Sequence, residues 1–413
     1  MDKDLVLLTL GSGRQSREFC RVAERLEYEV EHQHVREDVQ DWEVRETDEI
    51  LADAVEALAL LSRQPDAVIN FGRASVPDGI RRIAVSMELL RADGRLAAGT
   101  KLIGPSARAA QVWGDKALIA ESLRSLDLPI PATVDVDLGS VAELARRLER
   151  GEFPAPVVVK VVDLTGGSGM RYAADAEQLV KAVEELSQPG RRLVATEFVT
   201  GDEVSVDLLR LGTRTLLYPP GFKRVTDTDL THADHKIKVN GLVREVPVFS
   251  RDMLRIAEAF DLQGFFSLEA VITSTDPIRW HILEGATRVT NNIQMQDASL
   301  GFDSFAAVLR YIKGEDWLDG PERLGLALSI PMYRHHGLES VQALSGLDWV
   351  RQVKLEDLAQ MPDSKDVRLR LTAKMAVHDL GAQLAVIVAA TGDTDLPHRV
   401  RVEIERVRAT YVR

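Results

Sequence analysis

The pattern that most constrains this fold is an apolar segment followed by a glycine turn and an amphipathic helix, which occurs twice near the N-terminus. Residues 5–10 are apolar and precede a glycine-containing turn at residues 11–13. Residues 67–71 are apolar in the same way and precede Gly72 and a helical stretch. Strand, glycine turn and helix in alternation predict a parallel α/β sheet.

Further α/β units follow from about residue 100. The next helix is expected to carry Gly114-Asp115-Lys116, and residues 157–162 form an apolar strand that leads into a glycine loop. A helix then opens at Asp175, whose side chain can cap it. Further strands are expected at residues 193–199, 203–210, 265–272 and 280–283. From about residue 326 the chain is mixed and ends in a helix over residues 396–411, so the fold class is α/β and α+β.

Charge and cysteine content exclude several classes of protein. Asp and Glu number 64 against 51 Lys and Arg, for a net charge of −13, whereas nucleic-acid binding rests largely on basic residues that neutralise phosphates. Cys20 is the one cysteine, so a disulfide framework is excluded, and a packed core thiol is favoured over a nucleophile. The sequence shows no positively charged leader and no apolar stretch of membrane-spanning length. We therefore expect a cytoplasmic protein with no nucleic-acid or membrane partner.

Lys160 is the single polar residue of an otherwise apolar strand. Because side chains alternate across a strand, Lys160 shares a face with Val158 and Val162. A buried ammonium needs an anion or loses its proton, although a lysine at a sheet edge can instead extend to water. The loop after the strand contains Gly166, Gly167, Ser168 and Gly169, whose backbone N–H groups can surround phosphate oxygens. Together they predict a phosphate site, to which Lys116 can add a second ammonium.

Two glutamates are expected to face each other on a hairpin. If the chain turns between Asp276 and Pro277, Glu269 and Glu284 lie directly opposite, with Cβ atoms roughly 5 Å apart. Carboxylates at that spacing repel and need a cation or a raised pKa, and oxygen ligands beside phosphates indicate magnesium. The alternative is two solvent-facing glutamates, since a one-residue register slip would separate them.

Cationic residues near these acids are candidates for substrate binding. Arg288 follows Glu284 by four residues and can bind phosphate or carboxylate through two parallel hydrogen bonds. Residues 223–238 are rich in Lys, Arg and His and could form a loop that closes over a charged substrate. His232 and His235 in this stretch are better read as solvated loop residues than as metal ligands.

Taken in order, these blocks resemble the ATP-grasp superfamily, in the biotin-carboxylase-like branch that includes amino-acid ligases. The resembling text is IGPSARAAQVWGDKALIAESLRSLDLPIPA, PVVVKVVDLTGGSGMRY, ATEFVTGDEVSVD, and FSLEAVI with ILEGATR, which together cover roughly residues 100–290. The resemblance implies a parallel pre-ATP-grasp domain over residues 1–104 and an ATP-grasp domain over 105–320, with a lid subdomain at about 130–200. Residues 321–413 would form a mixed α+β cap.

The resemblance also implies roles for individual residues. ATP and Mg²⁺ are the implied cofactors, with Glu269 and Glu284 as metal ligands and Arg288, Lys236 and Lys238 in catalysis. Residues implied to bind the nucleotide are Lys116, Lys160, Gly166, Gly167, Ser168, Gly169, Thr196, Glu197, Phe198, Val199 and Glu203. Among these, Glu197, Phe198 and Val199 would line the adenine pocket, and Glu203 would bind the ribose hydroxyls.

This chain departs from the family pattern at two positions. The family often has a glutamate where this chain has Thr196, and its magnesium-binding asparagine two residues after the second glutamate is Ala286 here. Asn291 or Asn292 is a candidate substitute, or the metal relies on Glu269, Glu284, nucleotide and water.

The function that the resemblance implies is ATP-dependent amide formation from a small carboxylate and an amine through an acyl phosphate. The substrates would be amino acids or related metabolites, and the protein a homodimer. A bicarbonate-using carboxylase and an ATP-binding regulatory protein without turnover are the alternatives.

Overall fold

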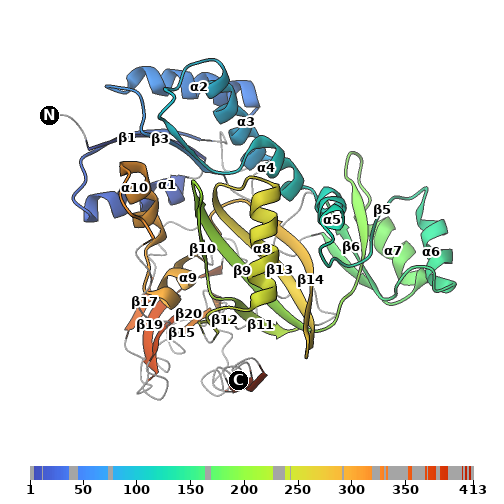
Figure 1. The fold of residues 1–413 in the computed structure, drawn as a ribbon. Coiled ribbons are helices and arrows are strands. Elements are labelled where there is room, and N and C mark those ends of the chain that lie inside the picture. The colour runs from blue at the N-terminus through green and yellow to red at the C-terminus, as the bar shows by residue number, and fades with distance from the viewer. Residues whose placement is uncertain are drawn as a thin grey trace.

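Three α/β units form the molecule in the computed structural model (Figure 1). The structure describes residues 4–11, 13–36, 45–72, 78–162, 169–226, 238–241, 243–290 and 293–318. It further describes six short strands between residues 326 and 388, and positions 402, 405, 406, 409 and 410. The units are an N-terminal sheet, a small antiparallel sheet and a large central sheet.

The N-terminal unit is a four-stranded parallel sheet with the strand order β2-β1-β3-β4. Its elements are β1 (Leu5–Gly11), α1 (Gly13–Arg25), β2 (Val30–Val35), α2 (Thr47–Leu60), β3 (Ala67–Phe71), α3 (Gly79–Ala92) and β4 (Lys101–Ile103). The prediction of a parallel α/β sheet is confirmed. Both β2 and α2 are elements that the sequence pattern did not indicate.

The chain around Lys116 forms two helices and not the single helix expected from the sequence. The first, α4 (Ala107–Gly114), ends before Asp115, which is extended, with φ −124° and ψ 114°. The carboxylate of Asp115 accepts hydrogen bonds from the backbone N–H groups of Ala117 and Leu118, and so caps α5 (Lys116–Ser125). An aspartate that directly follows a glycine can start a new helix, and Lys116 therefore begins a helix.

The small unit packs two helices on a four-stranded antiparallel sheet with the order β5-β8-β6-β7. Its elements are β5 (Thr133–Val136), α6 (Val141–Glu149), β6 (Val157–Val161), β7 (Met170–Ala173), α7 (Ala176–Leu186) and β8 (Leu193–Glu197). As predicted, Asp175 caps α7 by accepting the N–H of Gln178. Leu179, Val183 and Leu186 of α7 are buried in the core of this unit.

The large sheet contains ten strands, in the order β14-β13-β9-β11-β12-β15-β20-β19-β17, with β10 paired to β9. The strands up to the hairpin are β9 (Asp202–Leu211), β10 (Arg214–Leu217), β11 (Gly221–Val225), β12 (Lys238–Asn240), β13 (Gly264–Thr275) and β14 (Ile278–Ala286). The remaining strands are β15 (Leu326–Ser329), β17 (Gln352–Leu355), β19 (Leu371–Val377) and β20 (Ala382–Val388), while β16 (Met332–Tyr333) pairs with β18 (Arg368–Leu369). Its helices are α8 (Pro247–Ala259), α9 (Ile293–Leu300) and α10 (Ser304–Lys313).

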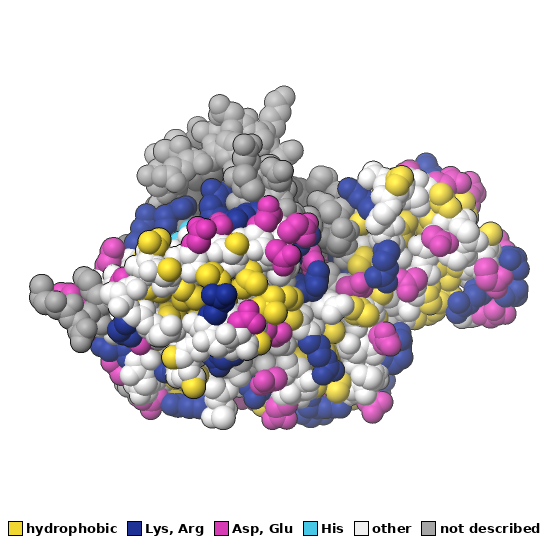
Figure 2. Space-filling model, turned by 90° about the horizontal axis from the view of Figure 1, so that it is seen from above, with side chains coloured by type: hydrophobic (Ala, Val, Ile, Leu, Met, Phe, Trp, Pro, Cys, Tyr) yellow, Lys and Arg dark blue, Asp and Glu magenta, His cyan; other side chains and the backbone are white. Residues whose placement is uncertain are grey.

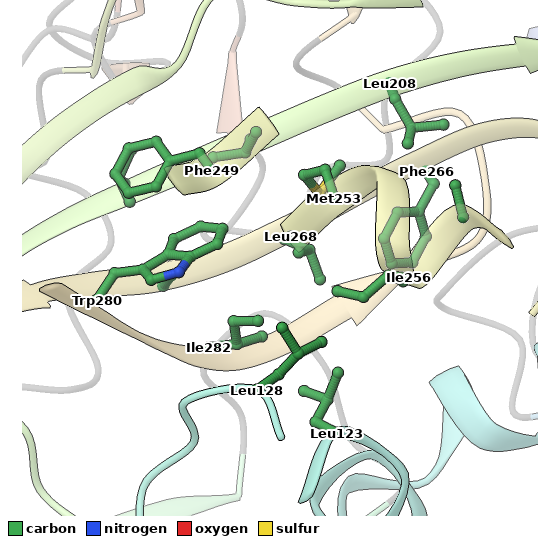
Figure 3. Close-up of a cluster of buried hydrophobic side chains, with 14 of the residues drawn as sticks. Leu123, Leu128, Leu208, Phe249, Met253, Ile256, Phe266, Leu268, Trp280 and Ile282 are labelled. Atoms are coloured by element: carbon green, nitrogen blue, oxygen red, sulfur yellow. The ribbon is translucent and has the colours of Figure 1, made fainter. Parts of the chain in front are cut away.

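The two faces of the large sheet differ in polarity because side chains alternate along each strand. On β9, Val204, Val206 and Leu208 enter the main hydrophobic cluster beneath α8, together with Phe266 and Leu268 of β13 (Figure 3). The intervening positions of β9 are Glu203, Ser205 and Asp207, which therefore point to the other face. One face of the sheet builds the core, and the other is available for polar chemistry.

A second cluster joins the N-terminal unit to the polar face of the large sheet. Phe19 and Phe71 of the N-terminal unit pack with Phe305 of α10, and Leu209 of β9 belongs to the same cluster. Around this unit, acidic and basic side chains are interspersed over the surface (Figure 2).

The buried carboxyl group of Asp297, on α9, makes the stability of the protein depend on pH. Its carboxylate accepts hydrogen bonds from the backbone N–H (3.1 Å) and the hydroxyl of Ser304. Burial raises the pKa of Asp297 from 3.8 to about 8, although those hydrogen bonds oppose part of the rise. The folded protein therefore holds this proton more tightly than the unfolded chain does, and stability is lost as the pH rises from the ordinary pKa toward 8.

We expect the Tm to fall as the pH rises over this range. The variant Asp297→Asn should lose most of this fall. Calorimetry of both proteins from pH 5 to pH 9 measures the two slopes. Equal slopes would contradict the assignment.

The C-terminal strands extend the large sheet, since β15 pairs with β12 and β20 pairs with β15. A boundary at residue 320 would thus divide one sheet, and the proposed domain limits remain predictions. The helix expected over residues 396–411 lies largely outside the described residues. Within the described chain, every helix is too short or too polar to cross a membrane.

Candidate functional site

The hairpin of β13 and β14 places two carboxylates directly opposite each other on the large sheet. Glu269 pairs with Glu284, and the turn falls between Thr275 and Ile278, as the sequence predicted. Residues paired in this way have Cβ atoms roughly 5 Å apart. Glu269 is half-buried and Glu284 is exposed, so the pair lies at an accessible edge of the polar face. This register prediction is confirmed.

Lys223 contacts this acid pair, which the sequence did not predict. Residues 223–238 were expected to form a loop, but Lys223 lies on β11 and Lys238 begins β12. The ammonium of Lys223 forms an ion pair with Glu269. Burial alone would lower the pKa of Lys223, but the carboxylates of Glu269, Glu203 and Glu284 hold it above its ordinary value. Residues 221–225 read Gly-Phe-Lys-Arg-Val and do not alternate between polar and apolar side chains, so the sequence pattern contained no sign of this strand.

Lys160 of β6 approaches Glu284, one member of the acid pair, from the small sheet. Val157, Val159 and Val161 enter the core of the small unit, so Lys160 and Val158 occupy the opposite face, as predicted. Burial lowers the pKa of Lys160, with nearby Glu284 acting to raise it and Lys116 acting to lower it further. The Lys160 ammonium is therefore within electrostatic reach of Glu284 on the other sheet.

Lys116 connects α5 to the end of β6. Its Nζ donates hydrogen bonds to the carbonyl oxygens of Val162 (2.9 Å) and Val161 (3.2 Å). The ammonium is thus held where the chain enters the glycine loop. Within this loop, Gly166, Gly167 and Ser168 lie outside the described residues. Gly169 has φ +67°, and its carbonyl accepts the N–H of Val161.

A hollow between the small sheet and the hairpin is lined by both lysines. Besides the two lysines, its lining contains two threonines and six apolar residues. The lining residues are Lys116, Ile119, Ala120, Ile130, Pro131, Thr133, Lys160, Thr196, Ile282 and Leu283. An apolar pocket with a few polar groups at defined positions is the usual form of a small-molecule site.

The end of β8 and the residue that follows it are tied to the rest of the fold. Glu197 accepts the N–H of Ala132 through its carboxylate (3.1 Å), and its own N–H donates to the Ala132 carbonyl (2.8 Å). The N–H of Phe198 donates to Pro156 (2.9 Å), and its ring meets Tyr172 edge-on. These N–H groups are used within the fold.

Arg288 lies just beyond the hairpin and is half-buried. Burial lowers the pKa of Arg288, while the neighbouring Glu284 acts to raise it. Its Nη1 donates to the carbonyl of Val289 (3.1 Å). Ala286, where the resemblance implies an asparagine, pairs with Ser267.

Several other candidate residues are not placed by the structure. Lys236, Asn291 and Asn292 lie outside the described residues. For Lys238 only the backbone is described, paired with Ser329.

The thiol of Cys20 is far from nucleophilic. Burial raises the pKa of Cys20 to about 11, with a further contribution from Glu24. The raised pKa agrees with the expectation that Cys20 is a packed thiol and not a nucleophile.

Comparison with known proteins gives partial sequence relatives and full-length structural ones. No family model matches the chain. A phosphoribosylamine–glycine ligase of Rhodopirellula baltica is 30% identical over 168 residues, which are 38% of each protein. The enzyme of the same name from Escherichia coli K12 is 33% identical over 143 residues, 32% of each protein. The chain thus spans well under half the length of these relatives.

Solved structures match nearly the whole chain. An N5-carboxyaminoimidazole synthetase of Staphylococcus aureus superposes with a TM-score of 0.64 at 13% identity, covering 98% of both chains. An Aspergillus clavatus N5-carboxyaminoimidazole synthase, solved with ADP and an aminoimidazole ribonucleotide, superposes with a TM-score of 0.66 at 16% identity. The match covers 97% of this chain and 99% of that one. A Hydrogenobacter thermophilus biotin carboxylase domain, solved as a dimer with MgADP and bicarbonate, superposes with a TM-score of 0.62 at 14% identity. The match covers 99% of this chain and 90% of that one.

Proposed function

From the ATP-grasp fold of this chain we propose that it is an ATP-dependent carboxylate–amine ligase that forms an amide through an acyl phosphate. The observation that supports this proposal most strongly is that Lys160, which lines the hollow, interacts electrostatically with Glu284, whose partner across the hairpin is Glu269. Ammonium groups beside paired carboxylates are what a metal-bound polyphosphate requires. The partial relatives named as phosphoribosylamine–glycine ligases form such a bond, which agrees with the proposal.

In this proposal the hollow binds ATP. Lys116 and Lys160 neutralise the phosphates, Glu203 binds the ribose hydroxyls, and the loop containing Gly166, Gly167, Ser168 and Gly169 closes over the phosphates. The base lies against Thr196 and the segment of Glu197, Phe198 and Val199. Since the N–H groups of Glu197 and Phe198 donate within the fold, the base would be recognised by other atoms of this segment.

Glu269 and Glu284 fit a magnesium ion. They are hard oxygen ligands on facing positions of a hairpin, and Mg²⁺ usually combines one or two carboxylates with phosphate oxygens and water. In this proposal the nucleotide and water complete the coordination of the metal. Bound magnesium would neutralise charge on the transferring phosphoryl group.

The reaction then has two steps. A carboxylate oxygen of the acid attacks the γ-phosphorus, and the bond to the β-phosphate oxygen breaks, which releases ADP. The amine nitrogen attacks the acyl carbon, phosphate leaves, and the nitrogen loses a proton to give the amide. Arg288, Lys236 and Lys238 are the proposed cations around the transferred phosphoryl group. The protein contributes positioning and charge neutralisation rather than a covalent intermediate of its own.

A carboxylase is the second candidate, because the structural likeness to N5-carboxyaminoimidazole synthetases extends over almost the entire chain. There, bicarbonate would replace the organic acid and the amine would be carboxylated. Ala286 permits a third reading, an ATP-binding regulatory protein without turnover. Tight ATP binding with no phosphate release would distinguish such a regulatory protein from the two enzymes.

The test is phosphate release from ATP with Mg²⁺, using purified protein in degassed buffer and all pairs from a panel of amino acids, small amines and small carboxylates. We expect phosphate release that needs both an acid and an amine, in stoichiometric amounts with the amide detected by mass spectrometry. Release that needs bicarbonate and an amine alone would favour the carboxylase. Absence of ATP binding by calorimetry would contradict all three readings. A cytoplasmic location and a homodimer remain predictions.

A further inference from the structure

Lys223 lies among three carboxylates that the proposed function assigns to metal and ribose. Its ammonium is paired with Glu269, and Glu203 and Glu284 both act on it electrostatically. The Lys223 side chain is 19% exposed and that of Glu269 is 27% exposed. An ion pair at this degree of burial is screened less by solvent than a surface pair.

The backbone that carries Lys223 is held in place by a residue from the C-terminal end of the chain. Arg406 donates to the carbonyl oxygen of Lys223 (2.9 Å) and forms an ion pair with Asp202 of β9 (2.6 Å). Arg406 therefore ties the backbone of β11 at Lys223 to β9. The part of Lys223 that remains flexible is its four-carbon side chain. Such a side chain can move its ammonium by several ångströms without a change in the backbone.

A divalent cation and the Lys223 ammonium compete for the same carboxylate. Glu269 faces Glu284, so a cation between the two carboxylates would lie close to the ammonium now bound to Glu269. Like charges at that distance repel, and the nucleotide phosphates would then be the nearest strong anions. Lysine suits this exchange because it binds oxygen anions as a point charge and not through a fixed geometry.

We propose that Lys223 is a positioning residue that holds Glu269 against Glu284 before the metal binds and transfers its ammonium to the phosphates once the metal is bound. This inference rests on the proposed function of the site. It gives the acid pair a built-in counter-charge in the free protein, which lowers the repulsion between the carboxylates. It also makes productive metal binding depend on nucleotide, because the phosphates accept the displaced ammonium.

The test measures metal and nucleotide binding separately in Lys223→Met, with Mn²⁺ as the metal probe. Free Mn²⁺ is counted by electron paramagnetic resonance without nucleotide, and binding of the non-hydrolysable analogue AMPPNP with Mg²⁺ is measured by calorimetry. We expect K223M to bind Mn²⁺ about three- to tenfold more tightly than the wild type, because the competing charge is gone. We expect its AMPPNP affinity to fall about tenfold, because one phosphate contact is lost.

The opposite signs of the two effects separate this role from a structural one, which would weaken both kinds of binding. Lys181→Met, at an exposed position of α7, is the matched control and should change neither affinity. If K223M does not fold, Lys223→Gln removes the charge while keeping a hydrogen-bond donor. Unchanged or weaker Mn²⁺ binding by the folded variant overturns the inference. Failure of the wild type to bind AMPPNP overturns the proposed function instead, and the Mn²⁺ comparison still decides the competition for Glu269.

Discussion

Glu284→Gln is expected to lower ATP-dependent phosphate release by about 10²–10³-fold, the loss found when one preorganised electrostatic group is removed from an active site. Glu284 faces Glu269 across the hairpin and is electrostatically linked to Lys160 and Arg288. Glutamine has nearly the same shape but binds a divalent cation much less strongly, because it carries no charge. The measurement is kcat and the Mg²⁺ concentration for half-maximal rate, with the latter expected to rise.

Glu258→Gln is the matched control for this prediction. Glu258 is exposed on α8, which covers the opposite face of the same sheet, so it tests the loss of one surface carboxylate. We expect its rate and Mg²⁺ requirement to equal those of the wild type. Thermal melts of both variants should coincide with that of the wild type, since Glu284 is itself exposed. A Glu284→Gln enzyme with an unchanged Mg²⁺ requirement would remove this residue from the metal site.

The hairpin shows how far register can be predicted from the sequence. The turn at Asp276 and Pro277 and the apolar pattern of both strands identified the facing glutamates. The pairing nevertheless contains two register shifts, between Glu269 and Ala270 and between Ile272 and Ser274, which offset each other. A single bulge would have moved Glu284 out of register with Glu269. Alternation predicts the face of a residue, but bulges depend on packing against neighbouring strands.

Other elements show where local pattern is insufficient. The helix break at Asp115 follows from a capping residue after a glycine, a signal that was present in the sequence but outweighed by apolar periodicity on both sides. The position of Lys223 depends on β11 pairing with β9, a contact between segments some twenty residues apart. Its partner Glu269 is still more distant in sequence. Lys223 and Lys238 were grouped as one loop because they are close in the sequence, whereas they lie on the neighbouring strands β11 and β12.

Lys160→Met is the second change expected to have a large effect, and it should lower activity without lowering stability. Lys160 lines the hollow together with Lys116 and is close enough to Glu284 to interact with it. If it neutralises the ATP phosphates, its loss should lower kcat/KM for ATP by about 10²–10³-fold. Most of this loss should appear as weaker nucleotide binding, measured as the Kd of AMPPNP by calorimetry.

The stability of the same variant separates a phosphate-binding lysine from a structural one. Burial lowers the pKa of Lys160, so the charged form is less favourable in the folded protein than in the unfolded chain. Methionine has a similar length and no charge, and it should leave the Tm of the nucleotide-free protein unchanged or higher. Lys181→Met on the exposed face of α7 should change neither Tm nor kcat/KM. A Lys160→Met protein that loses stability but binds AMPPNP normally would show that this lysine supports the small sheet and not the nucleotide.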